Sequence, residues 1–226
     1  MDATPSLIHT FFNPDILAKT APIVLASAGQ TVLLGFLIIV CGIGLGILLA
    51  SLRYYTRRRT VTALIVGYVD VLRALPPLVL LIVVYFALPY VNVSIDATLA
   101  TFLCLSAILS AFIEECVWSG IAALAQGQME AARSTGMTWS AAMRHVVLPQ
   151  ALKIALPQIT NRCIATIKNT ALGSVIGFNE VLGSAQAASS DFANPTPLTL
   201  SALVYIAMIL PFVLFSRYLE HRTGSH

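Results

Sequence analysis

Long stretches without charged side chains constrain this chain more than any other feature. Gly29–Leu52 contains no charged residue. At about 1.5 Å of rise per residue, a helix of this length can cross a hydrocarbon core about 30 Å thick. Only 10% of the 226 residues are charged, whereas soluble domains carry about 25%. The sequence therefore predicts an all-α integral membrane protein.

Four further spans are expected after Gly29–Leu52. Residues 61–88 contain Pro76-Pro77 and predict a tilted or broken helix with an amphipathic start. The other expected spans are Ala97–Ala123, Ala151–Ile176 with an interruption at Pro157, and Leu198–Leu219. The prediction is a bundle of five transmembrane helices.

The domain organisation follows from these spans. Residues 1–28 are expected to form a separate surface lead-in, because prolines break them into short pieces. Residues 29–222 form a single transmembrane domain with a polar loop at 127–150. Residues 223–226 are a tail with the composition of an expression scar.

Glycines and cysteines add two expectations. Gly42 and Gly46 form a G-x-x-x-G pattern, which lets a second helix approach closely, although glycine is also simply common in membrane helices. The four cysteines lie in apolar runs without a C-x-x-C pair and are expected to be free, buried small hydrophobes. They are Cys41, Cys104, Cys116 and Cys163. The four histidines are scattered, so no metal site is expected.

The basic residues decide the orientation. With five spans, all but one of the basic residues outside the spans fall on the same side of the membrane. They are Arg53, Arg57, Arg58, Arg59, Arg133, Arg144, Lys153, Arg217 and Arg222. Only Lys19 falls on the other side. The positive-inside rule then places the N-terminus outside and the C-terminus in the cytoplasm.

Gly127–Gln150 is the main polar interruption between the spans. Two short helices fit it, with a break at Gly136. Glu130 is expected in the first turn of the first helix, where a negative charge meets the positive end of the helix dipole. Thr138 can cap the second helix. The residues that then share one face are Trp139, Met143, Val146 and Val147. The segment could also be an amphipathic loop lying on the bilayer surface.

The same segment carries a resemblance. Glu130-Ala131-Ala132, then Gly136, then Leu148-Pro149 resembles the cytoplasmic signature loop of ABC-importer permeases, the membrane-spanning subunits of binding-protein-dependent transport systems. In that family the loop docks into a groove on an ATPase subunit. The match extends over about Gly29 to Arg222, and the subfamily it looks like transports polar amino acids. Further matching segments are Tyr68 to Pro76, Ala111 to Glu115, Leu156-Pro157, Asn161, Lys168 to Thr170, and Glu180.

The departures from the family lie in the spans and not in the loop. Ala74-Leu75 replaces Gly-Thr, and Trp118-Ser119 replaces Arg-Gly. Asn169 and Ala171 replace Asp and Ser, and Glu114 adds a second acid. The docking role is therefore better supported than any choice of substrate.

The resemblance implies a fold similar to type I importers and an assembly. A second permease copy, identical or paralogous, would complete the pathway in the bacterial inner membrane. Two ATPase subunits would hold ATP and magnesium, and a periplasmic binding protein would deliver an amino-acid substrate. The residues implied in ATPase coupling are Glu130, Ala131, Ala132, Arg133, Gly136 and Arg144. No cofactor and no nucleic acid is expected on this chain.

Charged residues within the spans are candidates for the substrate pathway, because a charge at mid-bilayer costs roughly 2.5–3.5 kcal/mol and needs a partner or a water-filled cavity. Glu114 and Glu115 point about 100° apart on a helix, so only one is expected to face the pathway. We favour Glu115 and expect Glu114 to pair with Arg73 or Arg162, or to stay protonated. Structural ion pairs and snorkelling are the alternatives for these charges. The pathway candidates are Arg73, Glu115, Trp118, Lys168 and Asn169.

No chemistry of bond breaking is visible. The sequence has no G-x-x-x-x-G-K-[ST], H-E-x-x-H or G-x-S-x-G motif, so the chain is not expected to be an enzyme itself. The favoured function is ATP-driven import of polar amino acids by alternating access. Import of opines, betaines or other small organic ions by the same architecture is the alternative. An ion-driven secondary transporter would predict an inverted repeat, which the five spans do not display.

Overall fold

The computed structural model describes residues 7–56, 58–125 and 127–223, and this part of the chain is helical without any strand. The α-helices are α1 (Leu7–Phe11), α2 (Pro14–Tyr55), α3 (Arg59–Ala74), α4 (Pro77–Ala87), α5 (Ala97–Ala122), α6 (Gln128–Ser134), α7 (Trp139–Ala142), α8 (Leu148–Asn169), α9 (Val181–Asp191) and α10 (Thr196–Thr223). Two 3-10 helices, η1 (Leu88–Val91) and η3 (Thr170–Ile176), and one π-helix, η2 (Met143–Val147), complete the order. The all-α prediction is confirmed.

Three helical stretches among the described residues are long and apolar enough to cross a membrane. They are Leu7–Tyr55, Ala97–Ala122 and Thr196–Tyr218. A fourth is obtained if α3 and α4 count as one broken span. The break was expected from Pro76-Pro77, and Leu75 is extended (φ −81°, ψ 132°), as a residue before proline prefers.

The expected fourth span, Ala151–Ile176, differs from the prediction. It forms α8 followed by η3, and α8 is not among the stretches apolar enough to span. Its charged residues Lys153, Arg162 and Lys168 lower its hydropathy. Pro157 lies inside α8 and does not interrupt it.

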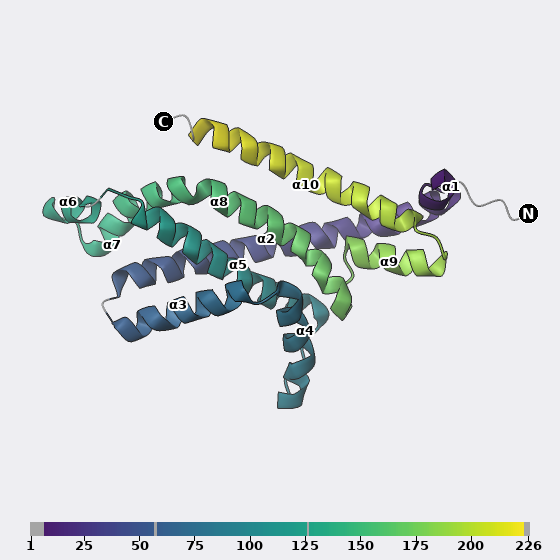
Figure 1. Ribbon diagram of the computed structural model, residues 1–226, viewed down its shortest axis with the longest axis horizontal. Helices are drawn as coiled ribbons and strands as arrows, with labels where there is room; N and C mark the ends of the chain where they lie inside the picture. The colour runs from purple at the N-terminus through teal and green to yellow at the C-terminus, as the bar shows by residue number, and fades with distance from the viewer. Residues whose placement is uncertain (1–6, 57, 126, 224–226) are drawn as a thin grey trace, which may run out of the picture. The chain divides into compact units, whose positions relative to one another are not determined.

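Helix α2 begins at Pro14, well before the expected start at Gly29. Figure 1 shows it as one continuous helix. Pro14 suits the first helical position, where its missing N–H leaves no bond unmade. The expectation that Pro22 breaks the chain is wrong. Thr20 and Val24 are fully buried on either side of it, so packing holds the helix through the proline.

The chain forms two compact units. The first unit comprises Met1–Ile38, Pro77–Leu105 and Ile164–Leu214. The second unit comprises Ile39–Pro76, Ser106–Cys163 and Phe215–His226. The core clusters of the first unit are Val24, Val181, Ala185 and Val204, and Leu81, Ala100, Cys104 and Ile176. A cluster of the second unit is Ile65, Val69 and Ala111.

The G-x-x-x-G pattern of α2 lies in the second unit, where it meets residues of α5. A Cβ atom on Gly46 would lie 2.6 Å from the Cβ of Ile113 and 2.7 Å from the Ser110 carbonyl oxygen. A Cβ atom on Gly42 would lie 2.8 Å from Leu109. Helix α2 therefore packs directly on α5 along this face, and the prediction of a close helix approach is confirmed.

We expect Gly46→Val to destabilise the protein by about 1–3 kcal/mol, the usual cost of overpacking a core. The added side chain would meet Ser110 backbone, which cannot move without shifting α5. Gly44→Val is the matched control on the same helix, since a Cβ atom there meets nothing within 4 Å. Thermal unfolding of the two purified variants in detergent measures the difference. Equal melting temperatures would contradict the packing described.

The cysteines only partly follow the prediction. All four are free, but only Cys104 and Cys116 are buried, whereas Cys41 is exposed and Cys163 is partly buried. An apolar sequence context did not distinguish a helix face that packs within the chain from one that does not.

Candidate functional site

The segment 127–150, here called the docking loop, has the predicted break. Helices α6 and α7 are separate short helices (Figure 1), and Gly136 between them has φ +90°. This left-handed conformation favours glycine. The Thr138 hydroxyl accepts a hydrogen bond from the Ala141 N–H at 3.3 Å, and Glu130 lies in the first turn of α6. Both local predictions are confirmed.

The inward face of the docking loop is also as predicted, although its helix type is not. Met143 and Val147 are buried, and Trp139 and Val146 are partly buried. From Met143 to Val147 the backbone is a π-helix, which is wider than an α-helix and often marks functional segments.

The outward face presents most of the residues implied in ATPase coupling. Ala132 is buried, and the exposed members are Glu130, Ala131, Arg133, Gly136 and Arg144. Next to Arg133 lies a groove of about 450 Å³, here called the aromatic groove. The residues that line it are Tyr54, Tyr55, Met129, Arg133 and Trp139. The loop thus exposes Glu130, Arg133 and Arg144, charged side chains of both signs, while the Trp139 ring packs against Tyr54 and Tyr55.

Glu114 forms an ion pair with a residue that was not among its expected partners. It is fully buried, and the Arg53 guanidinium donates to its carboxylate at 3.1 Å. The same guanidinium lies 4.0 Å from the centre of the Trp118 ring, a cation–π distance. The expected ion pair with Arg73 is wrong, because Arg73 pairs with Glu115 and Arg53, at the end of α2, pairs with Glu114. Trp118 is therefore occupied by a cation of the chain itself.

Arg73 and Glu115 are brought together as an ion pair of 3.3 Å between Nη1 and Oε2. More than a third of the surface of each side chain is exposed to solvent. Phe112 lies beside this pair, with Arg162 at 4.1 Å and Arg73 at 5.9 Å from its ring centre. An exposed acid, two cations and an aromatic ring of the second unit thus share one site. It contains two of the pathway candidates.

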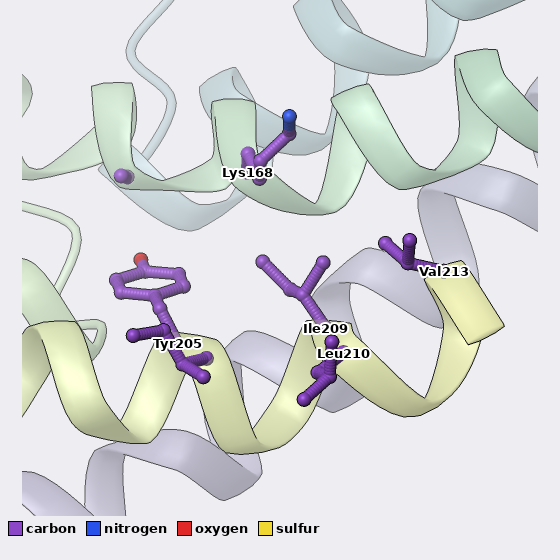
Figure 2. Close-up of a pocket in the computed structure, with 7 residues that line it drawn as sticks. Lys168, Tyr205, Ile209, Leu210 and Val213 are labelled. Carbon is purple, nitrogen blue, oxygen red and sulfur yellow. The ribbon is translucent and has the colours of Figure 1, made fainter.

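Lys168 and Asn169 lie at the end of α8, in the first unit. Lys168 lines an otherwise apolar pocket of about 440 Å³. Figure 2 shows Lys168 on one side of this pocket and side chains of α10 on the other, including Tyr205 and Ile209. Asn169 is partly buried.

Sequence reasoning missed the roles of Arg53 and Glu180. Arg53 was counted only as a charge at the membrane surface. Glu180 is fully buried and caps α9, accepting hydrogen bonds from the N–H groups of Leu182 and Gly183 and from the Tyr205 hydroxyl. Glutamate is not among the usual N-cap residues, so the sequence carried no capping signal at this position.

Comparison with known proteins identifies the family. Residues 42–225 match the family described as the binding-protein-dependent transport system inner membrane component. The chain belongs to this family. The matched range includes the docking loop and the five pathway candidates, so this permease carries its candidate sites within the family's own region.

Similar proteins are amino-acid permeases. The chain is 32% identical to the Probable amino-acid ABC transporter permease protein YckA of Bacillus subtilis, over 95% of both chains. It is 37% identical to the Probable glutamine ABC transporter permease protein GlnM of the same organism, over 69% of this chain and 73% of GlnM. The crystal structure of an amino acid ABC transporter with histidines matches at TM-score 0.81 and 32% identity, over 91% of this chain and 96% of that one. The inward-facing MetNI methionine ABC transporter, at 22% identity and TM-score 0.66, shares the fold.

Proposed function

We propose that this permease is the membrane-spanning subunit of an ATP-driven importer that moves polar amino acids across the bacterial inner membrane. Its amino-acid permease relatives support the substrate class. The observation that carries the coupling role is the docking loop. It presents Glu130 and Arg133 to solvent on α6, which a break at Gly136 separates from α7.

The proposed assembly has two permease copies, two ATPase subunits that carry ATP and magnesium, and an external binding protein. Five spans, with the N-terminus outside, would put the docking loop in the cytoplasm by the positive-inside rule. Helix α8 would then cross the bilayer with its polar side covered by protein, because charged side chains in a membrane face a bundle interior or a water-filled cavity. The segment that contains α9 (Val181–Asp191) would then lie outside, and it is the proposed contact for the binding protein.

Transport would proceed by alternating access. Closure of the ATPases around ATP would displace the docking loops, and the spans would exchange an outside-open pathway for an inside-open one. A zwitterionic amino acid needs a cation for its carboxylate and an acid for its amine. The Arg73–Glu115 pair supplies both, and its partial exposure is compatible with exchange of each partner for a substrate group.

The proposal is tested by measuring ATP hydrolysis of the purified complex in lipid, with its binding protein, across a panel of amino acids, opines and betaines. Stimulation by polar amino acids supports the proposal. Stimulation only by opines or betaines keeps the importer and changes the substrate class. Absence of an ATPase subunit, with transport that follows an ion gradient, would replace the proposal by a secondary transporter.

A second test addresses the break in the docking loop. We expect Gly136→Val to lower transport about tenfold or more, since a β-branched residue at positive φ is strained by roughly 1–3 kcal/mol. Nothing lies within 4 Å of the position of its Cβ atom, so the effect would arise from the backbone alone. Gly136→Asn is the matched control, because asparagine tolerates the left-handed region. Uptake in proteoliposomes measures both. Full uptake by the valine variant at normal membrane insertion would count against the docking role.

A further inference from the structure

The last turn of α2 contacts the docking loop through aromatic rings. The ring centre of Trp139 lies 4.6 Å from that of Tyr55, with 59° between the planes, and 6.2 Å from that of Tyr54, with 33° between the planes. Tilted rings at these separations are in the attractive range for aromatic pairs. Trp139 is the first residue of α7, so the start of this short helix is held directly by α2.

The residue that precedes these tyrosines is fixed to another helix. Arg53 donates to both carboxylate oxygens of Glu114, at 3.1 and 3.4 Å, and lies over the Trp118 ring. Glu114 and Trp118 both belong to α5, and Glu114 is fully buried. Three consecutive residues at the end of α2 therefore connect the docking loop to α5.

This connection is distinct from the covalent one. The docking loop is joined by the chain to α5 before it and to α8 after it, whereas α2 reaches it only across space. A displacement of α7 would reach α2 through packed side chains with little freedom to absorb it, because packed interiors transmit strain. The ion pair would then carry the same displacement to α5, since separating the buried charges is costly.

We propose that Trp139, packed against Tyr54 and Tyr55, transmits movement of the docking loop to α2, and that Arg53 with Glu114 makes the end of α2 move together with α5. This inference rests on the proposed ATPase-coupling role of the loop. Trp139 is a positioning residue in this scheme: it acts through α2 and does not touch the substrate.

The experiment compares Trp139→Ala with Trp139→Phe in the complete complex, reconstituted in liposomes with its binding protein. Three quantities are measured: ATPase subunits bound per permease, the rate of ATP hydrolysis, and substrate transported per ATP. For Trp139→Ala we expect bound, active ATPase with transport per ATP lowered about tenfold, within the usual range of coupling between sites. Trp139→Phe keeps an aromatic ring and should restore most of the coupling. Phe36→Ala, which removes an exposed ring from α2 away from the contact with Trp139, should leave coupling unchanged.

The possible results separate this inference from the proposed function. Unchanged transport per ATP in Trp139→Ala overturns the inference and leaves the importer intact. Loss of the ATPase subunit from that variant also overturns it, because Trp139 would then belong to the docking surface. A wild-type complex that holds no ATPase at all overturns the proposed function itself. Should Trp139→Ala fail to assemble, Tyr55→Ala tests the same contact from α2 and must give the same uncoupling.

Discussion

Replacing Arg53 by methionine should lower the free energy of unfolding by about 3–5 kcal/mol, the cost of removing one partner from a buried ion pair. Glu114 is fully buried, and the Arg53 side chain is only 16% exposed to solvent. Without the guanidinium, the carboxylate would lack its only ion-pair partner among the described residues. Methionine keeps a flexible apolar contact with the Trp118 ring, so the loss would report on the charge. Thermal and denaturant unfolding in detergent measure it.

The chain contains a matched control for this prediction. Arg73 pairs with Glu115, the residue next to Glu114, at a similar distance of 3.3 Å. Its two side chains are 35% and 38% exposed. Exposed pairs contribute about 0.2–1 kcal/mol, so Arg73→Met should affect stability far less than Arg53→Met. Under the proposed substrate contact of this pair, Arg73→Met should nevertheless lose transport.

A double variant distinguishes an ion pair from a simple loss of contacts. Arg53→Met combined with Glu114→Leu removes both charges, and buried pairs replaced by apolar residues of similar size are often neutral in stability. The Arg53 Nε atom is buried without a hydrogen-bond partner, so the native pair is not fully satisfied. We therefore expect the double variant to recover most of the loss. A double variant as unstable as Arg53→Met would contradict this account.

Local features of the docking loop were predictable because each depends on residues a few positions apart. A glycine between two short apolar periods predicted the break at Gly136, and a threonine before Trp139 predicted the cap. The close contact of α2 at Gly46 followed from glycine spacing within one helix. In each case, residues within the segment itself determine the backbone conformation or the close contact.

Partners that come from distant segments were not predictable in the same way. The 100° rotation between Glu114 and Glu115 correctly indicated that they face different surroundings. Which arginine lies opposite each of them depends on the rotation and depth of neighbouring helices, and the sequence contains neither. Arg53 was treated as a surface charge because it ends an apolar run, yet it turns inward to Glu114.

The predicted helix boundaries were wrong where tertiary packing outweighs the local preference of the sequence. Pro22 is a local signal against a helix, but the buried neighbours Thr20 and Val24 keep α2 continuous through it. For α8, the predicted span and the hydropathy of the helix disagree because of its polar side chains. A hydropathy criterion rejects this helix as a span, although in an assembly its polar side can be covered by protein.

The second large effect is expected at Glu180, where alanine should lower the free energy of unfolding by roughly 3 kcal/mol or more. Its carboxylate accepts from the N–H groups of Leu182 and Gly183, at 2.9 and 2.7 Å, and from the Tyr205 hydroxyl. Alanine would leave these three donors without their acceptor next to a buried cluster that includes Val181. Thermal unfolding of the purified permease, monitored by tryptophan fluorescence, measures the loss.

Two controls assign that loss to the buried carboxylate and not to capping in general. Asp96 caps α5 in the same manner, accepting from the Leu99 N–H at 2.9 Å, but it is open to solvent. Water can replace its carboxylate, so Asp96→Ala should be clearly milder. Tyr205→Phe removes one of the three donors and should cost about 1 kcal/mol. If Glu180→Ala were no worse than Asp96→Ala, the carboxylate would be a replaceable cap. The link it makes between α9 and α10 would then have to come from the apolar contacts of Val181 with Val204.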